Sequence, residues 1–189
     1  MSVVIEAKKK FLDRYNIDRS NTDALSKSIS AAVQHNKLYK SGLAESSRKE
    51  IRAYWGECLK EIQKTVENLT DEDYEKKILE LQEKMNSKFG DLFYNPEGFK
   101  ISHSQKSISV YLKHMWCLEE IGKPNQCPID SIVLKKIGKK YPYTKWTTVN
   151  DIEIHRNQIK DVRDFIIEKF GNETSLAEGE LLLFQSDEN

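Results

Sequence analysis

The chain has 189 residues, with 30 Lys and Arg against 30 Asp and Glu, so its formal net charge is zero. This balance argues against a wholly basic nucleic-acid coat protein and against an acidic tail protein. Eight Gly and four Pro are few for a many-turned β-sandwich, and no apolar run reaches the roughly 18 residues of a transmembrane helix. Three scattered cysteines without a Cys-x-x-Cys spacing exclude a zinc ribbon and a four-cysteine iron–sulfur cluster. We expect a cytoplasmic protein that does not enter a membrane.

Hydrophobic residues recur at helical spacing along almost the whole chain. The expected helices cover about residues 4–12, 22–33, 47–68, 70–89, 104–121, 130–138, 151–170 and 175–185. Thr70 with Asp73 forms an expected N-cap, and Ser175 with Glu178 an expected capping box. Breaks fall at residues 90–100 and 122–128, where Gly, Pro and Asn gather. The pattern predicts one all-α domain of about seven to nine helices over residues 1–189. Residues 1–92 would supply N-terminal helices, and residues 93–189 a hairpin, a charged segment and the C-terminal helices.

Charge is unevenly distributed along this neutral chain. Residues 100–145 hold nine lysines and only three acidic residues. Such a block suits local contact with phosphates, although a block in the sequence need not form a patch on the surface.

Two charged residues beside the second break carry the functional hypothesis. Lys106 lies near the start of its expected helix, and Lys113 shares its ridge two turns later. Asp130 ends Cys-Pro-Ile-Asp and precedes a short helix, so its first interpretation is an N-cap, worth about 1 kcal/mol. If this carboxylate also faces a cleft, it can stabilise positive charge that develops on a sugar. Pro124 and Pro128 would stiffen the loop that positions it.

The segment that holds Lys106 and Pro128-Ile129-Asp130 resembles the helix-hairpin-helix DNA glycosylases. In that family a lysine opens one helix, and a Pro-Val-Asp-like turn delivers an aspartate at the start of the next. The 24-residue interval between the two is similar to that of the archaeal 8-oxoguanine glycosylase branch. Ser102-His103-Ser104-Gln105 stands where the family usually has a Gly-x-Gly hairpin turn. The resemblance covers residues 101–138, about a fifth of the chain.

The resemblance implies excision of a damaged or modified base that is flipped out of DNA, an exchange that costs a few kcal/mol. Asp130 would stabilise the oxocarbenium-like sugar, while Lys106 would attack C1′ and form a Schiff base that permits strand cleavage. Residues expected to contact the base or the DNA are His103, Ser104, Gln105, Lys113, His114, Trp116, Tyr143, Lys145 and Trp146. DNA would be the partner of a monomer without cofactor or metal, associated with the nucleoid if the source is bacterial.

Other functions stay open at this point. If Lys106 were misplaced, Asp130 could direct water in a monofunctional glycosylase, and Lys113 is the second choice of amine. A non-enzymatic adaptor could use residues 47–68 and 70–89 as a helical hairpin with a partner face. An RNA-cleaving helical nuclease needs an Arg-x-x-x-x-His pair, and His155-Arg156 has the wrong order. The four histidines lack the carboxylate spacing of a metalloenzyme.

Overall fold

Eight α-helices build the parts of the chain that the structure describes. The computed structural model describes residues 3–18, 23–67, 69–94, 96–138 and 144–185. The helices are α1 (Val3–Tyr15), α2 (Asp23–Val33), α3 (Glu45–Gln63), α4 (Asp71–Phe89), α5 (Ile101–Cys117), α6 (Ser131–Lys136), α7 (Ile152–Phe170) and α8 (Leu176–Gln185), with 3₁₀ turns η1 (Gly90–Leu92) and η2 (Trp146–Thr148). The prediction of a single all-α domain with seven to nine helices is confirmed for these residues.

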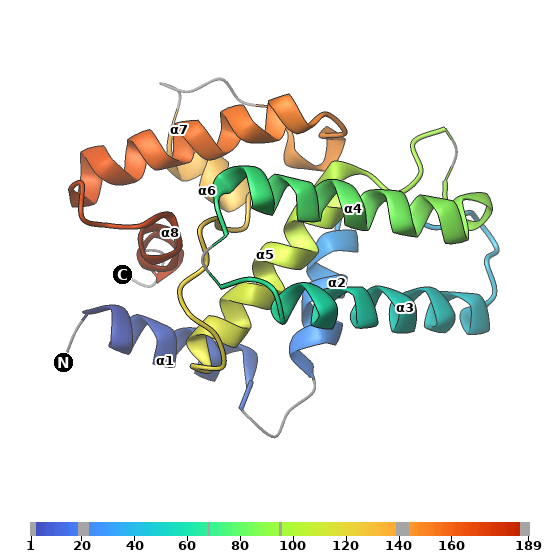
Figure 1. Cartoon of the computed structure of the whole chain (residues 1–189), viewed down its shortest axis with the longest axis horizontal. Helices are drawn as coiled ribbons and strands as arrows, with labels where there is room; N and C mark the ends of the chain where they lie inside the picture. Colours follow the sequence, from blue (N-terminus) through green and yellow to red (C-terminus); the bar gives the residue numbers. More distant parts are fainter. Residues whose placement is uncertain (1–2, 19–22, 68, 95, 139–143, 186–189) are drawn as a thin grey trace.

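Helix α5 crosses the middle of the molecule (Figure 1), where α1, α2, α3, α4 and α7 all contact it. All but one of its 17 residues are buried. The apolar ridge through Ile108, Leu112 and Met115 is buried, and so is the ridge that carries Lys106 and Lys113. Helical periodicity marks a core-facing ridge only where the opposite face meets water, so it does not reveal a helix that is covered on every side.

The main hydrophobic core lies where α5 meets α2, α3 and α4. Trp55 of α3 packs edge-on against Phe99, with ring centroids 4.7 Å apart. The inward ridge of α4 is buried and consists of Tyr74, Ile78, Leu81 and Met85. Two smaller cores join α6 to α7 and α8, and α1 to α8. The first and last described helices, α1 and α8, therefore pack against each other beside α5.

Side-chain caps fix two helix starts where the sequence predicts them. At α4, Thr70 Oγ1 accepts the Asp73 N–H (3.1 Å) and the Asp73 carboxylate accepts the Thr70 N–H (3.4 Å). At α8, Ser175 Oγ accepts the Glu178 N–H (3.3 Å) and the Glu178 carboxylate accepts the Ser175 N–H (3.1 Å). Both pairs are capping boxes, which satisfy N–H groups that the first helical turn leaves free.

Helix α5 begins at Ile101, earlier than the expected start near residue 104. The connection from α4 is latched by the Asn86 side chain, which donates to the Phe99 carbonyl and accepts the Phe99 N–H, both at 2.8 Å. Gly98 has φ +58°, and a Cβ there would lie 2.7 Å from Asn86 Oδ1, so this turn requires glycine. His103 Nδ1 then accepts the Lys100 N–H (3.0 Å). These contacts stabilise an extra turn of helix in front of Lys106.

In the described ranges, no helix is both long and apolar enough to span a bilayer. The expected start of the second helix, near residue 22, lies outside the residues that the structure describes.

Candidate active site

A pocket of about 300 Å³ lies between α1, α2, α5, α6 and α8. Aromatic side chains form much of its wall, namely Phe11, Tyr15, Trp146 and Phe184. Its ionisable lining groups are Lys27, His35, Lys106, Lys113, His114, Asp130 and Glu180. Three lysines face two carboxylates, so the lining carries an excess of positive charge. Apolar walls with a few convergent polar groups are typical of a site for a small ligand or for a single base.

Lys106 and Asp130 meet in this pocket. Lys106 Nζ donates to Asp130 Oδ2 at 2.7 Å, and both side chains are largely buried. The other carboxylate oxygen, Oδ1, accepts the N–H groups of Ile132 and Val133 at 2.9 Å each, so Asp130 is also the N-cap of α6. The cap holds the carboxylate at one orientation, because both of its oxygens are occupied.

The electrostatics of the pair favour an ionised Asp130. Burial opposes its charge, but the Lys106 ammonium and the hydrogen bonds from Lys106 and the α6 backbone outweigh burial and hold the pKa of Asp130 below its ordinary value. Because α5 begins at Ile101, Lys106 belongs to its second turn. The start expected from the sequence, near residue 104, would have placed Lys106 in the first turn. The aromatic ring of Trp146 lies 5.8 Å from Lys106 Nζ.

Gln105 fixes the turn that delivers Asp130. Its amide donates to the Ile129 carbonyl (2.9 Å) and accepts the Ile129 N–H (3.3 Å), two bonds within the buried interior. Because Gln105 precedes Lys106 and Ile129 precedes Asp130, this clamp sets the register between the two charged residues. Gln105 therefore acts on the position of the turn and does not line the pocket.

Replacing Gln105 by Met is expected to lower the free energy of unfolding by about 1–3 kcal/mol, because Ile129 would keep two buried backbone groups without partners. Urea unfolding followed by circular dichroism measures the change. Gln82→Met is the matched control, since Gln82 bonds Asn150 at the surface (2.7 Å) and its loss should change stability by less than about 0.5 kcal/mol. Equal losses in the free energy of unfolding for Gln105→Met and Gln82→Met would contradict the stabilising role of the bonds between Gln105 and Ile129.

Lys113 forms a second buried ion pair in the same pocket. Its Nζ donates to Glu180 Oε2 at 2.6 Å, and the two side chains are only 6% and 3% exposed. The ammonium also lies 4.5 Å from the Phe11 ring centroid and 4.6 Å from that of Phe184. Carboxylate and aromatic faces together offset the desolvation of the ammonium. Both members of the pair line the pocket.

His114 lines the pocket beside this pair and is uncharged at neutral pH. Burial, together with the nearby Lys113 and Lys27, lowers the pKa of His114 to about 3. Its ring packs against Phe11 and Tyr15, with centroids 4.9 and 5.7 Å away. Nδ1 is buried and has no hydrogen-bond partner among the described residues.

The structure places His103 and Ser104 away from the pocket, which corrects their expected role in contacting the base or DNA. His103 is fully buried, accepts the Lys100 N–H and contacts the Asn36 carbonyl (3.3 Å). Burial lowers the pKa of His103 to about 3, so it is a neutral structural group. Ser104 is also fully buried. The sequence placed His103 before the expected helix and Ser104 at its start, where the resembling family has its hairpin turn, but α5 begins at Ile101 and includes both residues.

Trp116 and Lys145 are not pocket residues either. Trp116 packs with α1 and α8, where Lys8 Nζ lies 4.5 Å from its ring centroid. Lys145 is exposed beside η2. Trp146 does line the pocket, while Tyr143 lies outside the described residues.

The lysines of residues 100–145 that the structure describes do not form one surface patch. Lys100, Lys106 and Lys113 are buried, each in an ion pair. Lys123 pairs with Glu178 at 3.0 Å, and Lys135 is exposed. Part of the block therefore supplies the pocket instead of the molecular surface.

Several pocket residues were not found from the sequence. Phe11, Tyr15, Lys27, Glu180 and Phe184 come from α1, α2 and α8, far from Lys106 along the chain. The one available signal was Glu180, an acid within the apolar run Leu-Ala-Glu-Gly-Glu-Leu-Leu-Leu, where a buried charge needs a partner.

The pocket brings together an amine, a carboxylate in contact with it, a second ion pair and aromatic walls. Such a set can perform nucleophilic and acid–base chemistry on a planar ligand. Within the described ranges, no group of three or more His, Cys, Asp or Glu is placed to hold a metal ion. Comparison with protein families, curated proteins and solved structures finds no match, so the likeness to helix-hairpin-helix glycosylases rests on this chain's own residues.

Proposed function

We propose that this protein is a DNA base-excision enzyme, a glycosylase with lyase activity that uses Lys106 as nucleophile and Asp130 as its proton acceptor. One observation carries the proposal: the 2.7 Å contact between Lys106 Nζ and Asp130 Oδ2 lies in an aromatic-walled pocket of about 300 Å³. The sequence resemblance and the pocket's positive excess point in the same direction, because the substrate is a polyanion.

The pocket suits a flipped base in shape and chemistry. The aromatic wall includes Trp146, whose ring can stack on a base. Lys113 can donate to the edge of the base and Glu180 can accept from it. Lys113 lies on the same ridge of α5 as Lys106, two turns further along, and Glu180 faces it from α8. A base that contacts Lys113 and Glu180 would therefore place its sugar on the side of the pocket where Lys106 lies.

The reaction begins with transfer of a proton from the Lys106 ammonium to the Asp130 carboxylate. The amine lone pair then forms a bond to C1′, and the bond from C1′ to the base breaks. The base leaves with the electron pair of the broken bond and takes up the proton from Asp130, whose restored carboxylate balances the positive charge of the new secondary ammonium at C1′. That ammonium passes one proton to the ring oxygen as the bond between C1′ and this oxygen breaks with its electron pair on the oxygen, and the nitrogen lone pair then forms the protonated imine with C1′. The Asp130 carboxylate then accepts a proton from C2′, the electron pair of that C–H bond forms the double bond between C2′ and C3′, and the 3′ phosphate leaves with the electron pair of its C–O bond.

Lys106→Gln is expected to lower base release and strand cleavage by about a thousandfold or more, because no amine remains at the reacting carbon. Single-turnover assays on duplexes that each carry one damaged or modified base, together with an abasic-site duplex, measure the effect. Lys135→Gln, a substitution of an exposed lysine on α6, is the control and should behave as the unchanged protein.

The results also separate the alternatives. Base release that persists in Lys106→Gln with no strand cleavage would assign a water nucleophile directed by Asp130. The proposal would be overturned if the unchanged protein released no base from any duplex and did not cleave the abasic-site duplex. That result would favour the non-enzymatic helical adaptor.

A further inference from the structure

A polar cluster outside the pocket holds the loop that carries Asp130. This loop runs from the end of α5 to α6, and Gln126 lies four positions before Asp130 within it. Gln126 is 2% exposed. Its Nε2 donates to Asp71 Oδ1 (3.4 Å) at the start of α4, and its Oε1 contacts His155 Nε2 (3.2 Å) in α7. The loop is therefore bonded to two helices that the pocket does not involve.

The chemistry of these partners fixes the direction of each hydrogen bond. A carboxylate only accepts, so the Gln126 amide nitrogen must face Asp71 and its oxygen must face His155. His155 Nε2 is consequently a donor, and burial lowers the pKa of His155 to about 4 despite the opposing effect of Glu75 and Asp71. The remaining ring nitrogen, Nδ1, is buried and has no partner in the described ranges. Asp71 Oδ2 accepts a hydrogen bond from Arg163 Nη2 (2.7 Å), so a series of hydrogen bonds runs from His155 through Gln126 and Asp71 to Arg163.

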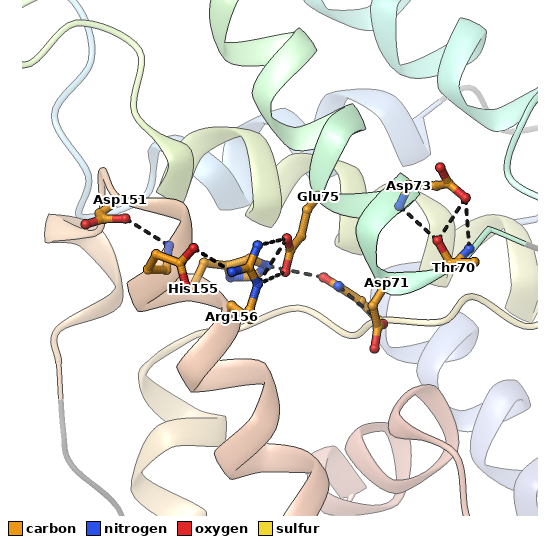
Figure 2. Close-up of polar contacts among 9 residues, drawn as sticks. Thr70, Asp71, Asp73, Glu75, Asp151, His155 and Arg156 are labelled. Carbon is orange, nitrogen blue, oxygen red and sulfur yellow. Dashed lines mark hydrogen bonds and ion pairs between the residues drawn. The ribbon is translucent and has the colours of Figure 1, made fainter.

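A second ion pair in the same cluster does not touch the loop. Figure 2 shows Glu75 of α4 and Arg156 of α7 pointing toward each other, with His155 beside them. Arg156 donates to both Glu75 oxygens, at 2.6 Å from Nη2 and 2.9 Å from Nε. Glu75 and Arg156 join α4 to α7, the two helices that also hold Gln126 through Asp71 and His155. A change in this pair therefore shows how much the packing of α4 on α7 affects the pocket when the bonds to Gln126 are kept.

We infer that Gln126, held by Asp71 and His155, is a positioning residue that keeps the Asp130 carboxylate against Lys106. Pro124 and Pro128 are both buried, and they flank Gln126 in the loop. Because proline restricts the backbone, a displacement of Gln126 is transmitted along the loop to Asp130. Gln105 anchors the loop from α5 and Gln126 anchors it from α4 and α7. The role in turnover rests on the proposed function, while the role in the Lys106–Asp130 contact stands without it.

The test compares Gln126→Leu, which keeps a side chain of similar size but loses both bonds, with Glu75→Gln, which weakens the Glu75–Arg156 pair and removes neither bond of Gln126. The first readout is the NMR signal of the Lys106 ammonium protons at neutral pH, whose exchange with water is slow only while the ion pair with Asp130 holds. We expect this exchange to become at least about tenfold faster in Gln126→Leu and to stay unchanged in Glu75→Gln. A similar acceleration in both variants, or none in Gln126→Leu, would overturn the inference.

A second pair of variants covers the case in which Gln126→Leu does not fold. His155→Gln restores an N–H donor toward Gln126, whereas His155→Leu does not. Exchange at Lys106 should be near that of the unchanged protein in His155→Gln and faster in His155→Leu, and equal exchange in both variants would contradict the inference.

Single-turnover base release is the readout that depends on the proposed function. It should fall by about tenfold to a hundredfold in Gln126→Leu, with little change in DNA affinity, because the reacting groups move by a fraction of an ångström. An unchanged protein that releases no base would contradict the proposed function alone, since the NMR comparison decides the positioning role separately.

Discussion

Replacing Asp130 by Asn is expected to slow base release by about a hundredfold to ten-thousandfold while leaving α6 folded. Asn caps a helix about as well as Asp, so the amide oxygen can still accept the N–H groups of Ile132 and Val133. The amide that replaces Oδ2 cannot accept the Lys106 proton or balance positive charge on the sugar. The loss should therefore appear in the rate of the chemical step and not in DNA binding.

Single-turnover kinetics and a separate measurement of DNA affinity check this expectation. Asp151→Asn is the matched control, because Asp151 caps α7 by accepting the Glu153 N–H (2.8 Å) and lies outside the pocket. The control should retain full activity and similar stability. A full rate in Asp130→Asn, or equal losses in both variants, would show that the carboxylate takes no part in the reaction.

Lowering the pH from about 6.5 toward 4 is expected to destabilise the protein steeply. The pKa values of His103 and His114 are about 3 and that of His155 is about 4, mainly because burial disfavours their charged forms. Unfolded histidines titrate near 6.5, so in this pH window the unfolded chain binds up to three more protons than the folded one. Stability from these groups is complete above about pH 6.5 and falls by roughly 4 kcal/mol per pH unit when all three contribute.

Urea unfolding at a series of pH values measures this slope. Over the roughly 2.5 pH units from 6.5 to 4 the three histidines together remove at most about 10 kcal/mol, which exceeds the lower part of the typical stability range of about 5–15 kcal/mol. His114→Gln removes one of the three protons and should reduce the slope by about a third. His35→Gln is the control, because His35 is exposed. A free energy of unfolding that stays flat from pH 6.5 to 4.5 would contradict the burial of these rings.

The sequence is sufficient for most of the helices, because local signals specify them. Thr70 with Asp73 and Ser175 with Glu178 mark helix starts through contacts three residues apart. The start of α5 was misplaced because its determinants are distant: the Asn86 side chain bonds Phe99 from another helix. A tertiary contact of this kind leaves no periodic trace in the sequence.

The pocket shows the same division between local and distant determinants. Lys106 and Asp130 stand out as a cation and a carboxylate near helix starts, and they lie together in the structure. Lys113 was named without its partner, since Glu180 lies 67 residues away on α8. His103 was misassigned because a histidine in a polar run gives no sign of whether it faces a ligand or a backbone carbonyl. Only packing distinguishes the two cases.

The central claim is that the Lys106 amine forms a covalent bond to C1′ of the substrate nucleotide. Borohydride reduction during reaction with abasic-site DNA, followed by proteolysis and mass spectrometry of the peptide adduct, tests it most directly. We predict a reduced sugar adduct on Lys106 and no adduct in Lys106→Gln. An adduct on Lys113, or a yield in Lys106→Gln equal to that of the unchanged protein, would contradict the account.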